Sequence, residues 1–228
     1  MLHTSHATRG MVTSPHHLAS QAGLDILKKG GTALEAVVAT AATLSAVYPH
    51  MTGLGGDAFW LIAYPDGRTC VIDACGAAAG QASLALYDKA GHTTIPWRGG
   101  LAANSMAGAV SGWREALRLS ARLQPTLPLQ DLLRDATYYA EQGYAVSDSE
   151  AALLREKQAE LATNPAFMAA YAGADSLVAH GDIRRNPALG RTLRQLAEQG
   201  LDSFYTGPLA QALCADLAES GSPLRLED

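Results

Sequence analysis

The stretch TALEAVVATAATLSAVYPHMTGLGGDAFWLIAYPDGRTCVID, residues 32–73, decides the fold of this 228-residue chain. No Asp, Glu, Lys or Arg lies between Glu35 and Asp57. The first part is rich in alanine and valine with few polar positions, so it predicts a helix that is covered on most sides. Thr32 and Glu35 have the T-x-x-E spacing of a capping box. Pro49 marks the end of the helix, since the residue before a proline avoids the helical region.

Two apolar segments follow this helix, at residues 59–64 and 69–72, with Pro-Asp-Gly at 65–67 between them. Short apolar runs on either side of such a turn predict a β-hairpin. Successive positions in both runs are apolar, which is typical of strands that are buried on both faces between two layers. We therefore expect the remaining segments to be helices and loops arranged around this helix and hairpin.

The rest of the chain predicts mainly helices, separated by glycine and proline. Asn186-Pro187 is expected to begin a helix that Gly200 ends, Gly143 to end another, and Ser147 with Glu150 to form a second capping box. The expected segments are a short strand at 10–13, helices from Pro15 to the Gly30-Gly31 pair and at 108–123, 129–142, 148–162, 187–199 and 208–219, a surface turn at 87–91, and mixed signals over 164–182.

Composition limits the class of protein. The chain is 48% hydrophobic with a formal net charge of −5, which suits one substantial domain or most of a larger one and argues against general nucleic-acid binding. Only 17% of the residues are charged, so part of the surface is expected to be covered by a second chain. No apolar run approaches the roughly 20 residues of a membrane span. The N-terminus lacks signal-peptide features, so a cytoplasmic location is expected, or a periplasmic one if a signal peptide was removed.

Neither cysteines nor histidines form a recognisable metal site, and no cofactor is expected. The three cysteines are odd in number and contain no C-x-x-C pair, which argues against a disulfide framework or a zinc site. The histidines near the N-terminus have no carboxylate or cysteine at ligand spacing, so a solvated cluster is the preferred interpretation. These residues are Cys70, Cys75 and Cys214, and His3, His6, His16 and His17.

Gly53-Leu54-Gly55-Gly56 precedes a strand and lacks the spacing of phosphate-binding loops. Its glycines permit either a tight turn or a close approach to a substrate or a neighbouring subunit. Asp57 and Asp73 lie at the ends of the hairpin, where they could act in a site or accept hydrogen bonds from turn amides. Both interpretations stay open at each position.

Two further residues are candidates for substrate binding. Arg98, next to Trp97 in a glycine-rich loop, could bind a carboxylate, although a surface ion pair is the commoner role of such an arginine. Cys75 has no adjacent base in the sequence, so a small buried thiol is favoured over a nucleophile. No catalytic set can be assembled from the chain, which also lacks a G-x-S-x-G motif. From the residues alone the chain is a soluble α/β domain with a buried sheet and enzymatic character.

Several segments together resemble the large-subunit half of the gamma-glutamyltranspeptidase family. They follow in order along nearly the whole chain, and the fourth is the most specific. They are GMVTSPH (10–16), ASQAGL (19–24), GGTA (30–33), PHMTGLGG (49–56) followed by Phe59, GAVSGW (108–113), AEQGY (140–144) with Val146-Ser147, NPAL (186–189) and GLDSFYTG (200–207).

This resemblance implies an α+β fold, the helix-rich large-subunit part of a four-layer αββα sandwich of the N-terminal-nucleophile hydrolase type. In that family one precursor cleaves itself into two subunits, and the threonine that begins the small subunit is the nucleophile and, through its amine, the general base. Residues 1–228 would then be a single incomplete domain with no catalytic residue of its own. His92-Thr93-Thr94 does not supply the family's Thr-Thr-His start, because the order differs.

The implied partner is the small subunit from the same precursor, with a dimer of heterodimers as a further assembly. The sequence departs from the family at 73–76, where Cys75 replaces the arginine that binds the α-carboxylate of a glutamyl group. A thiol cannot supply the charge-assisted bidentate bonds of an arginine. The resemblance is therefore to the amidohydrolase branch, with oxamate as the favoured small amide substrate and Arg98 as the candidate cation. A glutathione hydrolase or γ-glutamyl transferase, a cephalosporin-acylase-like enzyme and a non-catalytic relative are the alternatives.

Overall fold

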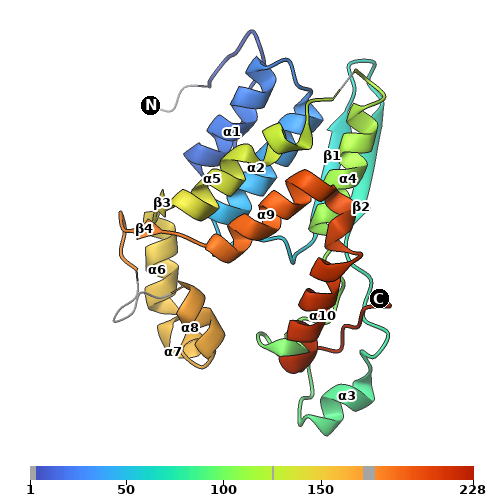
Figure 1. Ribbon diagram of the computed structural model, residues 1–228, viewed down its shortest axis with the longest axis vertical. Coiled ribbons are helices and arrows are strands. Elements are labelled where there is room, and N and C mark those ends of the chain that lie inside the picture. Colours follow the sequence, from blue (N-terminus) through green and yellow to red (C-terminus); the bar gives the residue numbers. More distant parts are fainter. Residues whose placement is uncertain (1–3, 125, 172–177) are drawn as a thin grey trace.

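The computed structural model describes residues 4–124, 126–171 and 178–228, so His3 and part of the 164–182 segment lie outside the described residues (Figure 1). In these residues helices dominate, and the strands form two small two-stranded sheets. No described helix is long and apolar enough to cross a membrane. The elements are α1 (His17–Lys28), α2 (Ala33–Val47), β1 (Ala58–Ala63), β2 (Thr69–Ala74), α3 (Leu84–Lys89), η1 (Gly100–Ala102), α4 (Ala109–Ser120), α5 (Leu129–Gln142), β3 (Tyr144–Ala145), α6 (Asp148–Glu156), α7 (Gln158–Leu161), α8 (Pro165–Tyr171), β4 (Ile183–Arg184), α9 (Pro187–Gln199), η2 (Leu201–Phe204) and α10 (Pro208–Glu219).

Helix α2 is the central element, packed against α1, α4 and α5. Its alanines and valines let neighbouring helices approach closely, and Val38, Ala39 and Ala42 are almost fully buried. At the crossing with α1, a Cβ added to Gly23 would lie 2.2 Å from Thr40 Oγ1, so only glycine permits this distance. The prediction of a helix that is covered on most sides is confirmed.

The capping box at the start of α2 is also confirmed. The Thr32 amide donates to Glu35 Oε2 at 2.7 Å, and the Glu35 amide donates to Thr32 Oγ1 at 3.1 Å. The structure adds a third contact, because Glu35 Oε1 accepts a hydrogen bond from the Leu127 amide at 2.6 Å. Glu35 is completely buried, so one carboxylate both begins α2 and holds the loop before α5.

The beginning of α1 differs from the sequence prediction. Residues 10–13 form no strand, and the helix begins at His17 with His16 as its cap rather than at Pro15. His16 Nδ1 accepts a hydrogen bond from the Leu18 amide at 3.3 Å, and its ring stacks on that of His17 with centroids 4.8 Å apart. An imidazole nitrogen can accept in this way only when it is unprotonated.

The hairpin β1–β2 is antiparallel, with Trp60 opposite Ile72 and Leu61 opposite Val71. Its inner face packs on α4, where a Cβ on Gly112 would be 2.9 Å from Trp60 Nε1. Within this chain only the inner face is buried, so burial of the outer face against a second layer stays a prediction. Three large apolar side chains of the outer face are 65–79% exposed, because no described element covers them: Phe59, Leu61 and Val71.

Beyond this core, α6, α7 and α8 with strands β3 and β4 form a small group that we call the helical lobe (Figure 1). The predicted capping box at its start is only half present. The Glu150 amide donates to Ser147 Oγ, but the Glu150 carboxylate turns inward to Tyr144 and Arg184 instead of back to the cap. The single helix predicted over 148–162 is divided into α6 and α7 at Lys157.

Helix α9 belongs to the core, where its Leu193 and Leu196 are fully buried. Helices α9 and α10 have the predicted bounds, and α9 packs on α5. The predicted surface turn at 87–91 is mostly the end of the short helix α3, which begins after a Ser83 cap.

We expect the stability of the protein to fall as the pH drops from 7.5 to 5, in part through His16. Burial, followed by the charges of His17 and His50, lowers the pKa of His16 below its ordinary value of 6.5. A folded-state pKa below the unfolded one contributes stability above pH 6.5 that is lost on acidification. Asparagine caps helices without titrating. His16→Asn should therefore flatten the pH dependence of the melting temperature, whereas His6→Asn, at an exposed position, should not. Equal pH dependence in both variants would contradict this account.

Candidate functional site

The end of the hairpin brings together three residues that the sequence singled out. Asp73 Oδ1 accepts a hydrogen bond from the Cys75 amide at 3.0 Å. Asp57 Oδ1 accepts one from the Gly76 amide at 3.2 Å, and the Cys75 thiol donates to Asp57 Oδ2 at 3.8 Å. The two aspartates thus fix the turn that carries Cys75, so the turn-amide interpretation is the one that the structure supports.

Two glycines let the chain after β2 approach the start of α4. A Cβ on Gly76 would lie 1.4 Å from the Met106 carbonyl oxygen, and a Cβ on Gly108 would lie 1.9 Å from the Ala74 carbonyl oxygen. Any side chain at either position would push the two backbone segments apart. The position of Cys75 therefore depends on close backbone packing, which the sequence could indicate only as a general richness in glycine.

The Gly53-Leu54-Gly55-Gly56 loop lies next to this turn. It joins α2 to β1, and the Gly56 carbonyl accepts a hydrogen bond from the Ala109 amide at 2.8 Å. A cavity of about 480 Å³ lies beside the loop, lined by Pro49, Met51, Thr52, Gly53, Gly56 and Asp57 together with residues of α2 and α4. A Cβ on Gly53, Gly55 or Gly56 would meet nothing within 4 Å among the described residues. The three glycines thus leave the backbone of the loop open to a ligand or another chain.

The charge around Cys75 is negative. Asp57, followed by partial desolvation and Asp73, raises the pKa of the Cys75 thiol above its ordinary value. The thiol therefore stays protonated at neutral pH and can donate a hydrogen bond, but it is a poor nucleophile. It is exposed rather than buried, so the expectation of a small buried thiol is wrong.

Arg98 lies in a loop away from these contacts. Its Nε donates to Glu160 Oε1 of α7, and both side chains are partly exposed. Among the described residues, no hydrogen bond or ion pair connects Arg98 to Cys75 or Asp57. The surface ion pair that the sequence allowed is present, while a role in substrate binding stays a prediction.

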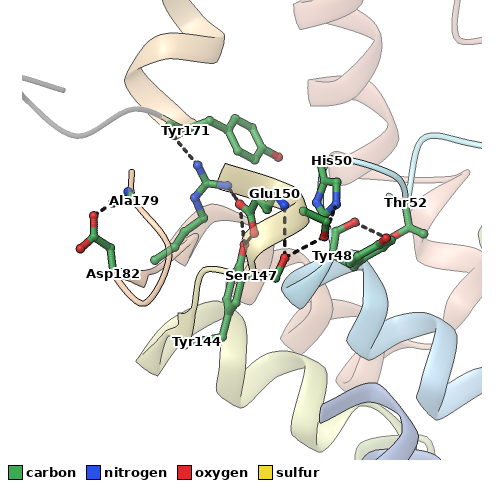
Figure 2. A network of polar contacts seen from close by, with 11 residues as sticks. Tyr48, His50, Thr52, Tyr144, Ser147, Glu150, Tyr171, Ala179 and Asp182 are labelled. Atoms are coloured by element: carbon green, nitrogen blue, oxygen red, sulfur yellow. Dashed lines mark hydrogen bonds and ion pairs between the residues drawn. The ribbon is translucent and has the colours of Figure 1, made fainter. Parts of the chain in front are cut away.

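A second polar cluster, which the sequence analysis missed, lies within the helical lobe, where it joins α6, α8, β3 and β4 (Figure 2). Arg184 pairs with Glu150, and both are buried, with 6% and 0% of their surface exposed. Tyr144 Oη donates to the Glu150 carboxylate at 3.1 Å. Arg184 also donates to the Tyr171 carbonyl and lies over its ring, 5.0 Å from the centroid. Burial raises the pKa of Tyr144, which therefore stays a donor. The only signal in the sequence was Glu150 itself, assigned to a cap.

Metal binding finds no support in the part of the chain that the structure describes. There, no three His, Cys, Asp or Glu side chains gather closely enough to hold an ion. The chemistry of the hairpin end is instead that of hydrogen bonding, with carboxylates, a protonated thiol and open backbone.

Comparison with known proteins decides the family, since the family model described as gamma-glutamyltranspeptidase matches residues 19–228. The chain belongs to the gamma-glutamyltranspeptidase family. It is 50% identical over its whole length to an oxamate amidohydrolase proenzyme of Klebsiella pneumoniae, and 36% identical, over 97% of the chain, to a glutathione hydrolase-like proenzyme of Bacillus subtilis. The gamma-glutamyltranspeptidase of Helicobacter pylori superimposes with a TM-score of 0.89 at 28% identity, over 99% of this chain and 64% of that one.

These likenesses confirm the helix-rich α+β fold of the family's N-terminal-nucleophile hydrolases. The chain spans 43% and 41% of the two curated relatives, which are proenzymes. Family members named among the relatives are hydrolases, so the general expectation of hydrolase chemistry is supported by the family. That residues 1–228 form one incomplete domain stays a prediction.

Proposed function

We propose that this chain is the large-subunit part of a self-cleaving amidohydrolase that converts oxamate and water into oxalate and ammonia. The observation that carries the proposal is the 50% identity to an oxamate amidohydrolase proenzyme along the full length of the chain. In this proposal a threonine at the start of the small subunit attacks the amide carbon, and ammonia leaves. Water then hydrolyses the acyl intermediate and restores the threonine hydroxyl.

The residues described here would shape the substrate site rather than perform the attack. The open glycine loop and Asp57 line a cavity of about 480 Å³, and the neutral Cys75 thiol lies behind this lining with its hydrogen bond to Asp57. Because Asp57 and Asp73 lie close to Cys75, the carboxylate of oxamate needs a cation elsewhere. Arg98 is the proposed cation, and it would have to exchange its contact with Glu160 for the substrate.

A γ-glutamyl hydrolase or transferase is the second candidate, favoured by the 36% identity to a glutathione hydrolase-like proenzyme. Against it, the neutral Cys75 between two carboxylates offers no charge to the α-carboxylate of a glutamyl group.

The complete protein should be assayed with oxamate, by oxalate and ammonia release, and with a γ-glutamyl anilide. Oxamate turnover without anilide turnover supports the amidohydrolase. Anilide turnover without oxamate turnover supports the second candidate and overturns the first.

We further propose a cytoplasmic location, which fractionation of expressing cells would test.

Arg98 gives a sharper test of substrate binding. A charge-assisted hydrogen bond contributes about 1.5–3 kcal/mol, so Arg98→Ala should raise KM for oxamate by roughly tenfold to a hundredfold. Glu160→Ala frees the guanidinium and should lower KM. If Arg98 forms only a surface ion pair, neither variant changes KM, and that result would remove Arg98 from the site.

A further inference from the structure

His50 lies where the glycine loop meets the helical lobe. It follows Pro49 at the end of α2 and comes three residues before Gly53. Its neighbours Pro49, Met51 and Thr52 line the cavity of about 480 Å³, whereas His50 is not part of that lining and its Nε2 faces Ser149 of α6. The side chain of His50 thus connects the segment that carries the cavity to another part of the molecule.

The contact is made by Ser149, in the first turn of α6. Ser149 Oγ lies 3.3 Å from His50 Nε2 and 3.1 Å from the Oγ of the capping residue Ser147. On its other side the His50 ring packs on Tyr48, with centroids 4.2 Å apart. Burial, and then the charge of Arg184, lowers the pKa of His50, so the ring is neutral at pH 7 and pairs with the hydroxyl without a charge.

Buried contacts inside the helical lobe hold the first turn of α6, which carries Ser149, in place. The next residue, Glu150, is fully buried and holds Arg184 of β4 and Tyr144 of β3. A buried, fully paired carboxylate allows little movement of the helix turn that carries it. Ser149 therefore lies on a rigid helix turn when it contacts His50 in the segment 49–52, which leads into the glycine loop.

The residue just before the glycine loop, Thr52, is held by hydrogen bonds to the backbone of α2. The Thr52 hydroxyl shares its single proton between the carbonyl oxygens of Leu44 and Tyr48, which lie 2.9 and 3.1 Å from Oγ1, and this closes the last turn of α2. Between Thr52 and the Gly56–Ala109 hydrogen bond, Leu54 is buried in the core, while the three glycines around it have no side chains to restrict the backbone. A small rotation at residues 49–52 would consequently move the open backbone of the loop.

We infer that His50 is a positioning residue, which holds the Gly53–Gly56 loop in the conformation that binds substrate through its hydrogen bond to Ser149. The inference rests on the proposed function, since it assumes that the loop contacts the amide substrate. It assigns to the helical lobe a role in substrate affinity although the lobe lies outside the cavity.

The test uses a matched pair of substitutions in the complete protein. The amide of glutamine reaches about as far as Nε2 and can donate to or accept from Ser149, whereas that of asparagine ends near the position of Nδ1. His50→Asn should raise KM for oxamate about fivefold, as expected from one lost hydrogen bond, with kcat within about twofold. His50→Gln should restore both constants to within about twofold. Ser149→Ala, at an exposed position, should reproduce the KM change without altering the loop sequence.

Equal KM changes in the glutamine and asparagine variants, or no change in Ser149→Ala, would overturn the inference. If the wild-type protein does not hydrolyse oxamate, the proposed function fails, and amide hydrogen exchange of residues 50–58 then tests the positioning role alone. His50→Asn and Ser149→Ala should accelerate exchange there about fivefold with other segments unchanged, and His50→Gln should not. Unchanged exchange in this segment would overturn the inference on structural grounds as well.

Discussion

Leu61→Asp is expected to abolish maturation and to reduce amide hydrolysis by at least about a hundredfold in the complete protein. Leu61 is 79% exposed in this chain and lies opposite Val71, with Phe59 two residues away on the same outer face. Adjacent exposed apolar side chains mark an interaction surface. Burying each contributes about 1.5–3 kcal/mol, and a carboxylate placed among them would have no partner.

The control is Leu84→Asp. Leu84 is 86% exposed at the start of α3, so it has the same size and a similar exposure but lies outside the hairpin. It should leave maturation and activity near wild type. Denaturing electrophoresis and oxamate turnover measure both effects. If the two variants behaved alike, the outer hairpin face would not be the surface that the rest of the precursor covers.

Glu150→Ala is expected to lower the free energy of unfolding by about 3–5 kcal/mol, because it leaves the buried Arg184 without its partner. Tyr144 would lose its acceptor at the same time. Glu156→Ala, which removes an exposed pair with Lys157, should cost less than about 1 kcal/mol and serves as the matched control. Chemical denaturation of the complete protein measures both.

A double variant separates the lost pair from the uncompensated charge. Replacing both partners, as in Glu150→Leu with Arg184→Met, should recover much of the stability that Glu150→Ala loses, since two apolar groups need no mutual pairing. A double variant that is as unstable as the single one would show that the hydrogen bonds to Tyr144 and Tyr171, rather than the isolated charge, dominate.

Local patterns predicted the elements whose ends are determined by neighbouring residues. Thr32 and Glu35 form the predicted capping box, and Asn186 begins α9 as expected. Gly143 and Gly200 end α5 and α9 with positive φ angles of 102° and 88°, a conformation that glycine adopts readily. In these cases the residues that determine where a helix begins or ends lie within four positions of that boundary.

Features that depend on distant residues were not predictable. Glu150 has the spacing of a capping box, but its carboxylate is taken by Arg184, 34 residues away. His16 caps α1 through a ring nitrogen whose pKa is lowered by burial, an effect that depends on residues packed around it in the fold. The apolar pattern of the hairpin indicated burial on both faces, and within this chain only the inner face is covered. In the candidate site, the sequence identified Asp57, Asp73 and Cys75 separately, and their hydrogen bonds follow from close approach at Gly76.

The most direct test of the central claim is the mass of the fragments that the complete protein forms. The claim is that this chain shapes a site whose nucleophile comes from the rest of the precursor. We expect two fragments, the smaller beginning with threonine, and we expect Thr→Ala at that position to stop both cleavage and oxamate hydrolysis. A single uncleaved chain that hydrolyses oxamate would contradict the account.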